Sequence, residues 1–238
     1  MENKVEFKVY GKYALFTDPL TKIGGEKCSY QIPTYQALKG ILESVYWKPT
    51  IVWIIDKVRV MKAIRTQTKS TKPIKYSGGN SLAIYTYLSD VEYQVQAHFE
   101  WNKYRPDMEN DRNENKHFFV AKRMIERGGR RDVFLGTREC QGYVEPCYFG
   151  EGEGAYDHLD ELAFSLMFHG FDYSDESGKN ELYSRFWRPK MQNGVIEFEL
   201  PEKCTKKFVR PMFAKPLISV GLQEEGLMEG YLEEEATI

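Results

Sequence analysis

The sequence predicts an α+β fold, because several segments alternate apolar and polar residues and two others carry apolar residues at helical spacing. The 238 residues are 42% hydrophobic, which supplies the core of one large domain or two small ones. No run of about 18 apolar residues occurs, and the charged N-terminal residues are unlike a signal peptide. The sequence therefore predicts a cytoplasmic protein with no membrane contact.

The first predicted strand and helix have clear boundaries. Residues 5–16 alternate around Gly11, which predicts a strand with a bulge or bend. A helix is expected from about Thr34, a plausible N-cap, to Val45, because the apolar residues between them share one face. Pro49 follows closely and excludes a longer helix.

Three strand-like runs follow. Residues 51–64 predict a long strand, and the basic, glycine-containing stretch 66–80 is too long for a simple turn, which indicates a functional loop. Residues 82–88 and 91–101 alternate on either side of Ser89-Asp90, which predicts a hairpin.

A second helix and a further strand complete this part. The helix is expected over 116–127, before Gly128-Gly129, and the strand over 132–144. The order reads βαββαβ, which is that of a ferredoxin-like, RNA-recognition-motif-like domain whose antiparallel sheet often serves as a nucleic-acid platform. We assign residues 1–147 to this domain.

The remainder differs in composition. An acidic, glycine-rich stretch at 148–160 predicts a boundary, and three short strands beyond it predict a small antiparallel β domain over 148–222. Residues 223–238 are expected to form an acidic tail. The predicted short strands are 162–173, 182–191 and 194–200.

Charge is segregated along the chain although the net charge is only −2. Seven basic residues and no acid occur from Lys57 to Lys75, whereas residues 145–161 hold six acids and no Lys or Arg. Such asymmetry indicates a face that binds a polyanion. The alternative is a solvated charged surface, which is what charge runs usually form.

One stretch combines proton-transfer groups with cations. Lys116 and His117 stand at the predicted start of the second helix, and Arg130 and Arg131 follow the glycine pair. This arrangement could hold a phosphodiester and move its protons. The four cysteines, Cys28, Cys140, Cys147 and Cys204, contain no CxxC motif, so reduced thiols are expected rather than a zinc site.

Four motifs resemble the CRISPR-associated Cas5 family of subtype I-C (the Dvulg type). They are SYQIPTYQALKGILESVYWKPT, WN(x)₁₃KH, GGRRDVFLGTREC and LMFHGFDY, and the resemblance runs from about residue 4 to residue 215. It implies a ferredoxin-like protein of the RAMP superfamily with a C-terminal β domain. It further implies a metal-independent endoribonuclease, without cofactors, that cuts the repeat hairpin of precursor CRISPR RNA. Such a protein is implied to stay on the 5′ handle of the mature guide RNA, beside the backbone and large subunits of the surveillance complex.

The resemblance places the catalytic residues on Tyr46, Lys116 and His117. Metal-free RNA cleavage needs a base for the 2′-OH, an acid for the leaving oxygen and a cation for the phosphorane. A histidine suits proton transfer, because its unperturbed pKa is about 6.5. Lys116 would hold charge on the non-bridging oxygens, and Tyr46 would orient the 2′-OH or transfer protons if cations lower its pKa. The structural alternatives are a core aromatic for Tyr46 and a capping imidazole for His117.

Candidate RNA-binding residues come from the basic run, the second helix and the glycine turn. They are Lys57, Arg59, Lys62, Arg65, Lys69, Lys72, Lys75, Arg123, Arg127, Arg130 and Arg131, with Trp47 and Tyr76 as aromatics that could stack on bases. Arg131-Asp132 could instead form an internal salt bridge. His98 and His169 are expected to be structural.

Two other function classes remain open from the sequence. One is a non-catalytic scaffold that caps guide RNA, and the other is a general nucleic-acid-binding module with affinity for duplex DNA. A nucleotide-cofactor enzyme is disfavoured, because no P-loop or GxGxxG motif follows a predicted strand.

Overall fold

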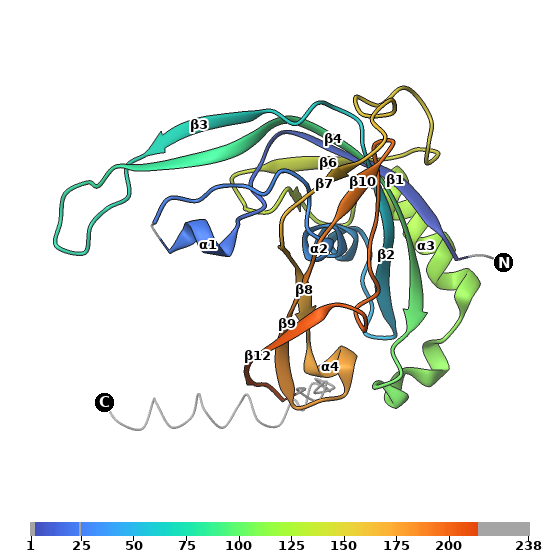
Figure 1. Cartoon of the computed structure of the whole chain (residues 1–238). Coiled ribbons are helices and arrows are strands. Elements are labelled where there is room, and N and C mark those ends of the chain that lie inside the picture. Colours follow the sequence, from blue (N-terminus) through green and yellow to red (C-terminus); the bar gives the residue numbers. More distant parts are fainter. Residues whose placement is uncertain (1–2, 24, 214–238) are drawn as a thin grey trace, which may run out of the picture.

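The computed structural model describes residues 3–23 and 25–213, so the predicted acidic tail at 223–238 lies outside the described residues. The α+β class is confirmed (Figure 1). The helices are α1 (Pro19–Lys22), α2 (Tyr35–Val45), η1 (Pro106–Asp111), α3 (Glu114–Glu126) and α4 (Ser174–Ser177). The first six strands are β1 (Val5–Ala14), β2 (Ile51–Val60), β3 (Thr66–Thr71), β4 (Ala83–Trp101), β5 (Val133–Phe134) and β6 (Gln141–Pro146). The later strands are β7 (Leu162–Ala163), β8 (Met167–Asp172), β9 (Glu181–Trp187), β10 (Lys190–Gln192), β11 (Val195–Glu197) and β12 (Thr205–Pro211).

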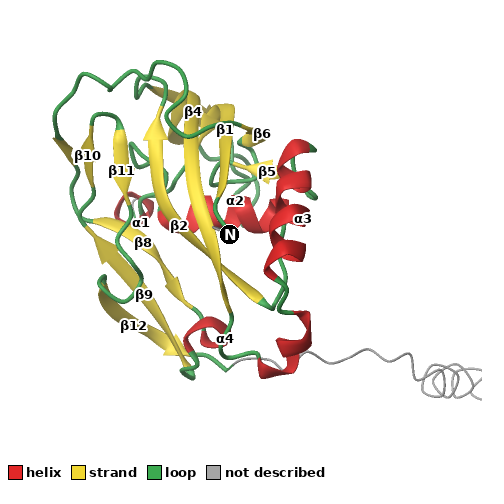
Figure 2. Ribbon diagram, turned by 90° about the vertical axis from the view of Figure 1, so that its right-hand side faces the viewer, coloured by secondary structure: helices red, strands yellow, loops and turns green. Residues whose placement is uncertain are grey.

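The centre of the main sheet has the predicted ferredoxin-like topology. Its strands follow the spatial order β6-β1-β4-β2, and every neighbouring pair is antiparallel. Figure 2 shows α2 passing behind this sheet and α3 standing beside it. Phe7, Trp53 and Leu38 are fully buried, because the apolar face of β1, β2 and α2 meets in one core.

The predicted hairpin at Ser89-Asp90 is wrong. Residues 83–101 form one strand, β4, which pairs with β3 near its start and with β1 and β2 farther along. Asp90 adopts a left-handed φ of 54°, but both flanking segments stay in the sheet. The stretch 66–80, predicted as a loop, therefore contains β3, and β3 and β4 form the long arm seen on the left of Figure 1.

Gly11 in β1 lets another segment pack close to the strand, and Gly136 forms a turn before β6. The register of β1 against β4 is unbroken from Val5 to Ala14, so the predicted bulge at Gly11 is absent. A Cβ on Gly11 would lie 2.6 Å from a methyl carbon of Leu135. The single strand predicted over 132–144 is a hairpin of β5 and β6, which turns at Gly136 with φ of 94°.

The segment after residue 148 does not form one separate sheet. β12, β9 and β8 form a three-stranded sheet, whereas β11 pairs with β2 and continues through β10 and β7. The predicted strand 194–200 thus joins the main sheet, because the edge of β2 away from β4 offers unpaired backbone groups. The proposed division at residue 147 stays a prediction.

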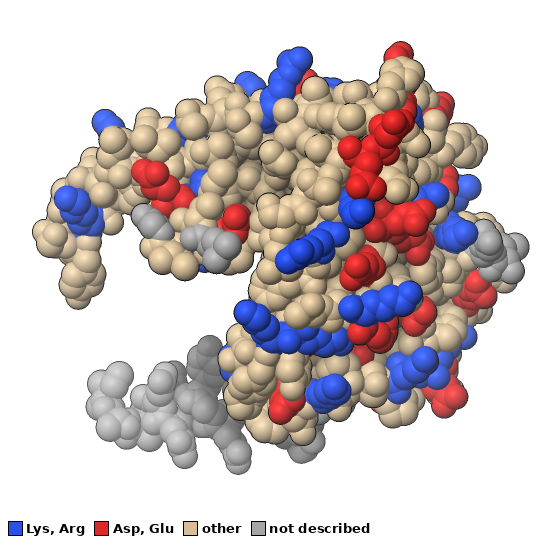
Figure 3. All heavy atoms as spheres, viewed as in Figure 1, with Lys and Arg blue, Asp and Glu red and all other residues tan. Residues whose placement is uncertain are grey.

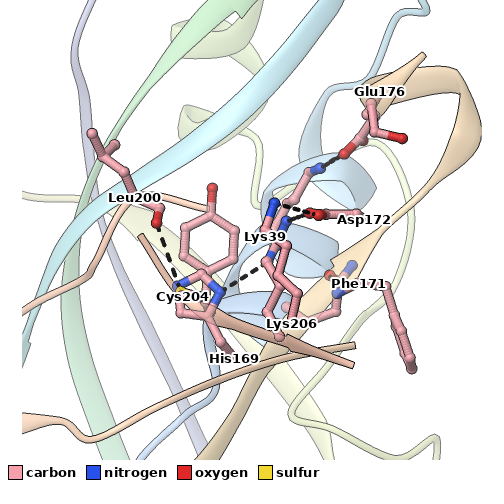
Figure 4. A network of polar contacts seen from close by, with 12 residues as sticks. Lys39, His169, Phe171, Asp172, Glu176, Leu200, Cys204 and Lys206 are labelled. Atoms are coloured by element: carbon pink, nitrogen blue, oxygen red, sulfur yellow. Dashed lines mark hydrogen bonds and ion pairs between the residues drawn. The ribbon is translucent and has the colours of Figure 1, made fainter. Parts of the chain in front are cut away.

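A buried polar network attaches the three-stranded sheet to α2 (Figure 4). The Lys39 ammonium on α2 lies 2.5 Å from the Glu176 carboxylate on α4, and it is almost completely buried. Arg185 on β9 pairs with Asp172 on β8. Buried charges are tolerated when they are paired in this way. The pair of Lys39 and Glu176 therefore fixes α2 relative to α4, which connects β8 to β9 of the smaller sheet.

Both main helices begin at capping residues. Thr34 caps α2 as predicted, because its side chain accepts a hydrogen bond from the amide of Ala37. Asn113 caps α3 by accepting from the amide of Lys116, so α3 begins slightly before the predicted residue. Within residues 3–23 and 25–213, no helix has the length and apolar character needed to cross a membrane.

Candidate active site

The ends of α2 and α3 bring Tyr46 and His117 into contact. Tyr46 directly follows the last residue of α2, and its main-chain oxygen accepts a hydrogen bond from the Trp53 indole at 2.7 Å. The Tyr46 hydroxyl lies 2.8 Å from Nδ1 of His117, 71 residues later in the chain. The two residues singled out from the sequence therefore form a direct pair.

The surroundings of His117 determine which ring nitrogen carries the proton. Its side chain is fully buried, against the rings of Phe99 and Trp101. Nε2 lies 2.8 Å from the main-chain oxygen of Asp111, and a carbonyl can only accept a hydrogen bond. Neutral His117 thus donates from Nε2, which leaves Nδ1 to accept the hydroxyl proton of Tyr46.

The pKa of Tyr46 is raised, whereas the sequence allowed a proton-transfer role for Tyr46 only if cations lowered this pKa. Burial raises the pKa of Tyr46 to about 12, and the negative charge of Asp111 adds to the shift. The condition of a pKa lowered by neighbouring cations is not met, since Lys116, adjacent to His117 in the sequence, is paired with that aspartate. At neutral pH Tyr46 therefore keeps its proton and can donate it to His117.

Lys116 is exposed beside this pair and is held by Asp111. Its side chain is 51% exposed, and Nζ lies 2.5 Å from Oδ1 of Asp111. Hydrogen bonds from Lys116 and Thr50 lower the pKa of the Asp111 carboxyl, so it stays ionised. Asp111 was not identified from the sequence, because an acidic residue in a polar stretch forms no recognisable pattern. Only the folded η1 helix brings it next to Lys116 and His117.

A groove lined by arginines lies next to the end of α2. Trp47, Arg130 and Arg131 line a cavity of about 350 Å³, and the side chain of Trp47 is 45% exposed. The amide of Arg131 donates to the main-chain oxygen of Ser44, so the glycine turn rests against α2. The structure records no salt bridge for either arginine among residues 3–23 and 25–213, so the suggested pair Arg131-Asp132 is not formed there.

Arg59 corrects the predicted RNA-binding set. Its side chain is buried, and its guanidinium pairs with Asp157 at 2.6 Å. It also donates to the main-chain oxygens of Glu151 and Gly152, at 3.2 and 2.9 Å. All these partners belong to the acidic segment, which folds over β2, so Arg59 is structural and is not available to phosphate.

The other members of the basic run are spread over several environments. Lys57 lies over the ring of Phe149, and Lys62 pairs with Asp90 at 2.7 Å. Lys69 lies over the ring of Tyr13. On the face of the molecule drawn in Figure 3, acidic and basic side chains are interspersed over the right half. The remaining candidates are exposed, namely Arg65 directly before β3, Lys72, Lys75 and Tyr76 between β3 and β4, Arg123 on α3, and Arg127 directly after α3.

No group of three or more His, Cys, Asp or Glu side chains within the described ranges is arranged to hold a metal ion. His98 pairs with Asp56 at 2.8 Å, and His169 lies in the buried network between α2 and the smaller sheet. Both histidines therefore have partners within the fold, as the sequence suggested.

Fold and site together define an RNA-recognition-motif-like α+β protein in which two helices assemble a Tyr-His pair beside a lysine. The family model Cas_Cas5d, described as CRISPR-associated protein (Cas_Cas5), matches residues 5–199. The chain belongs to this CRISPR-associated Cas5 family.

Three relatives illustrate the match. The CRISPR pre-crRNA endoribonuclease Cas5d of Mannheimia succiniciproducens is 30% identical, over 83% of this chain and 95% of the relative. The protein of that name from Thermus thermophilus is 27% identical, over 78% of this chain and 80% of the relative. A solved structure described as a CRISPR-associated protein is 35% identical with a TM-score of 0.73, covering 87% of this chain and 97% of that one.

Proposed function

We propose that this chain is a metal-independent endoribonuclease that cleaves precursor CRISPR RNA at the repeat hairpin. It then remains on the 5′ handle of the guide RNA as a subunit of a type I-C surveillance complex, with backbone and large subunits as partners, in the prokaryotic cytoplasm. The name of the relatives, pre-crRNA endoribonuclease, supports this substrate. The observation that carries the proposal is the contact of 2.8 Å between the Tyr46 hydroxyl and His117.

The tautomer of His117 suggests how protons move. The RNA 2′-hydroxyl gives its proton to the Tyr46 oxygen while Tyr46 passes its own proton to Nδ1 of His117. This relay suits a tyrosine whose raised pKa keeps it protonated and a histidine that is buried away from solvent. The 2′-oxygen then attacks phosphorus, which gives a 2′,3′-cyclic phosphate and a 5′-hydroxyl.

Lys116 supplies positive charge beside the pair, and the arginine groove supplies it next to the end of α2. The half-exposed ammonium of Lys116 stabilises the phosphorane oxygens and can protonate the leaving 5′-oxygen. Arg130 and Arg131 bind phosphates on the strand that runs from the scissile bond, and Trp47 stacks on a base. The exposed basic residues of the arm and of α3 hold the rest of the hairpin.

The direct test uses purified protein and an end-labelled repeat RNA in the presence of EDTA. Cleavage should proceed, and the products should carry a 2′,3′-cyclic phosphate and a 5′-hydroxyl. A 2′-deoxy substitution at the scissile nucleotide should stop cleavage without weakening binding. Continued cleavage of that substrate would falsify attack by the 2′-hydroxyl.

A non-catalytic capping scaffold is the second candidate, and the complete burial of His117 favours it. The substitution His117→Ala separates the two, because an enzyme loses cleavage and keeps RNA binding, whereas a scaffold has no cleavage to lose. A general module for duplex DNA would instead bind unrelated duplexes as tightly as the repeat hairpin, which a competition assay measures.

A further inference from the structure

We propose that Asp111 is a positioning residue, which holds Lys116 and His117 in one arrangement relative to Tyr46. The inference rests on the proposed function, because it assigns a task within the same RNA-cleaving site.

Asp111 contacts both residues through different atoms. Its carboxylate Oδ1 lies 2.5 Å from the Lys116 ammonium, and its main-chain oxygen lies 2.8 Å from Nε2 of His117. The second carboxylate oxygen, Oδ2, accepts a hydrogen bond from Thr50 at 2.7 Å and lies 3.5 Å from Nε2 of His117. Asp111 thus contacts its neighbours in the site through three acceptor oxygens.

Thr50 connects this arrangement to the segment that follows α2. Its side chain is almost completely buried, and it stands four residues after Tyr46 and directly before β2. The carboxylate of Asp111 therefore joins the chain after Tyr46 to the chain before Lys116. This is a second link between the two halves of the site, independent of the Tyr46-His117 hydrogen bond.

The two parts of Asp111 perform different tasks. The main-chain oxygen fixes the neutral tautomer of His117, and the carboxylate lies near the positive charge that forms when His117 takes a proton from Tyr46. The groups that face the imidazole are Tyr46, which follows α2, Asp111 from η1 and the rings of Phe99 and Trp101 from β4. Lys116, which precedes His117 on α3, contacts the Asp111 carboxylate instead.

A purely structural role, that of capping α3, is already filled. Asn113 is the N-cap, and its side chain accepts from the amide of Lys116 at 3.0 Å. The Asp111 side chain is therefore not needed to begin the helix. Its hydrogen bonds go to side chains of the site rather than to the helix backbone.

The test compares Asp111→Asn, Thr50→Val and the control Asp107→Asn. Asparagine removes the charge of residue 111 and keeps its main-chain oxygen, and valine removes only the hydrogen bond from residue 50. Asp107 lies in the same η1 helix, is 51% exposed and pairs with Arg105 away from the site. Single-turnover cleavage of the repeat RNA is measured at saturating RNA, together with Kd for the 2′-deoxy RNA and thermal melting.

For Asp111→Asn the cleavage rate at saturating RNA should fall about 10- to 100-fold with Kd unchanged. Thr50→Val should reduce the rate less, again with Kd unchanged, and Asp107→Asn should match the wild type in both rate and Kd.

A wild-type rate in Asp111→Asn, or a lower rate matched by an equally weakened Kd, would overturn the inference, as would an equal loss in Asp107→Asn. If Asp111→Asn no longer melts cooperatively, Thr50→Val decides: a lower rate at unchanged Kd supports the inference, and an unchanged rate rejects it. If the proposed function is wrong, the wild-type protein itself does not cleave the repeat RNA. That outcome is distinct from a loss of cleavage in the variants alone.

Discussion

Two histidines in this fold are completely buried, and they differ mainly in the partner at one ring nitrogen. His117 and His169 both contact aromatic rings, Phe99 and Trp101 for the first and Tyr35 and others for the second. Each has Nε2 within 3.0 Å of a main-chain oxygen. Their burial and aromatic surroundings are therefore alike.

The difference lies at Nδ1. The Tyr46 hydroxyl faces Nδ1 of His117, whereas the Arg185 guanidinium donates to Nδ1 of His169 at 3.3 Å. Burial, and then the charge of Arg185, lowers the pKa of His169 to about 3. A guanidinium keeps its protons, but a tyrosine can release one. The partner at Nδ1, rather than burial, therefore separates His117, for which we propose proton transfer, from His169, which has a structural role.

The largest expected effect comes from removing the Tyr46 hydroxyl. Tyr46→Phe should reduce single-turnover RNA cleavage about 10²- to 10⁴-fold, because His117 loses the group through which it acts. RNA affinity should not change. The matched control is Tyr35→Phe on the same helix, which contacts His169 and should leave cleavage unaltered. If Tyr35→Phe lost as much cleavage activity as Tyr46→Phe, the proposed difference in role between His117 and His169 would be wrong.

The second effect is on stability. Arg185→Leu leaves the largely buried Asp172 with Lys206 as its remaining partner, and should lower the free energy of unfolding by about 3 kcal/mol. Denaturant titration measures the change. The cleavage rate of the folded fraction should stay at the wild-type value, and a specific loss of cleavage would instead connect the network to the site.

The third effect is on the pH dependence of stability. The folded pKa of His169, about 3, lies below its unfolded value of about 6.5, so the unfolded chain binds more protons between these values. Stability should fall with decreasing pH from about 6.5 towards 3, by as much as about 1.4 kcal/mol per pH unit from this group. In His169→Gln this part of the slope should be lost. Parallel wild-type and variant curves would contradict the assignment.

The smallest expected effect tests the groove. Arg130→Gln should lower the slope of log Kd against log salt by about 1 and leave the cleavage rate of bound RNA unchanged. Arg188→Gln, an exposed arginine between β9 and β10, is the control and should not alter the slope. An identical slope for both variants would place the RNA elsewhere.

The sequence correctly predicted features that depend on the pattern of neighbouring residues, such as caps and helix ends. The cap at Thr34 and the helix to Val45 follow from neighbouring residues, and both are confirmed. The approach of Tyr46 to His117 could be expected because a βαββαβ order places both helices on one face of the sheet. Their catalytic roles stay a proposal.

The errors concern interactions between distant segments. Arg59 belongs to a run of basic residues, but its partner Asp157 comes from a segment almost a hundred residues later. Ser89-Asp90 has the residues of a turn, yet pairing with β3 and β1 keeps both sides extended. Asp111 reaches the site only through the path of η1. None of these contacts leaves a periodic signal in the sequence.

The continuity of β4 has a mechanical consequence. A strand of 19 residues would span roughly 60 Å if fully extended. One end of β4 forms the arm with β3, and the other carries Phe99 and Trp101 against His117. Because both ends belong to one hydrogen-bonded strand, β4 connects the arm directly to the rings that cover His117, with the left-handed residue Asp90 between them.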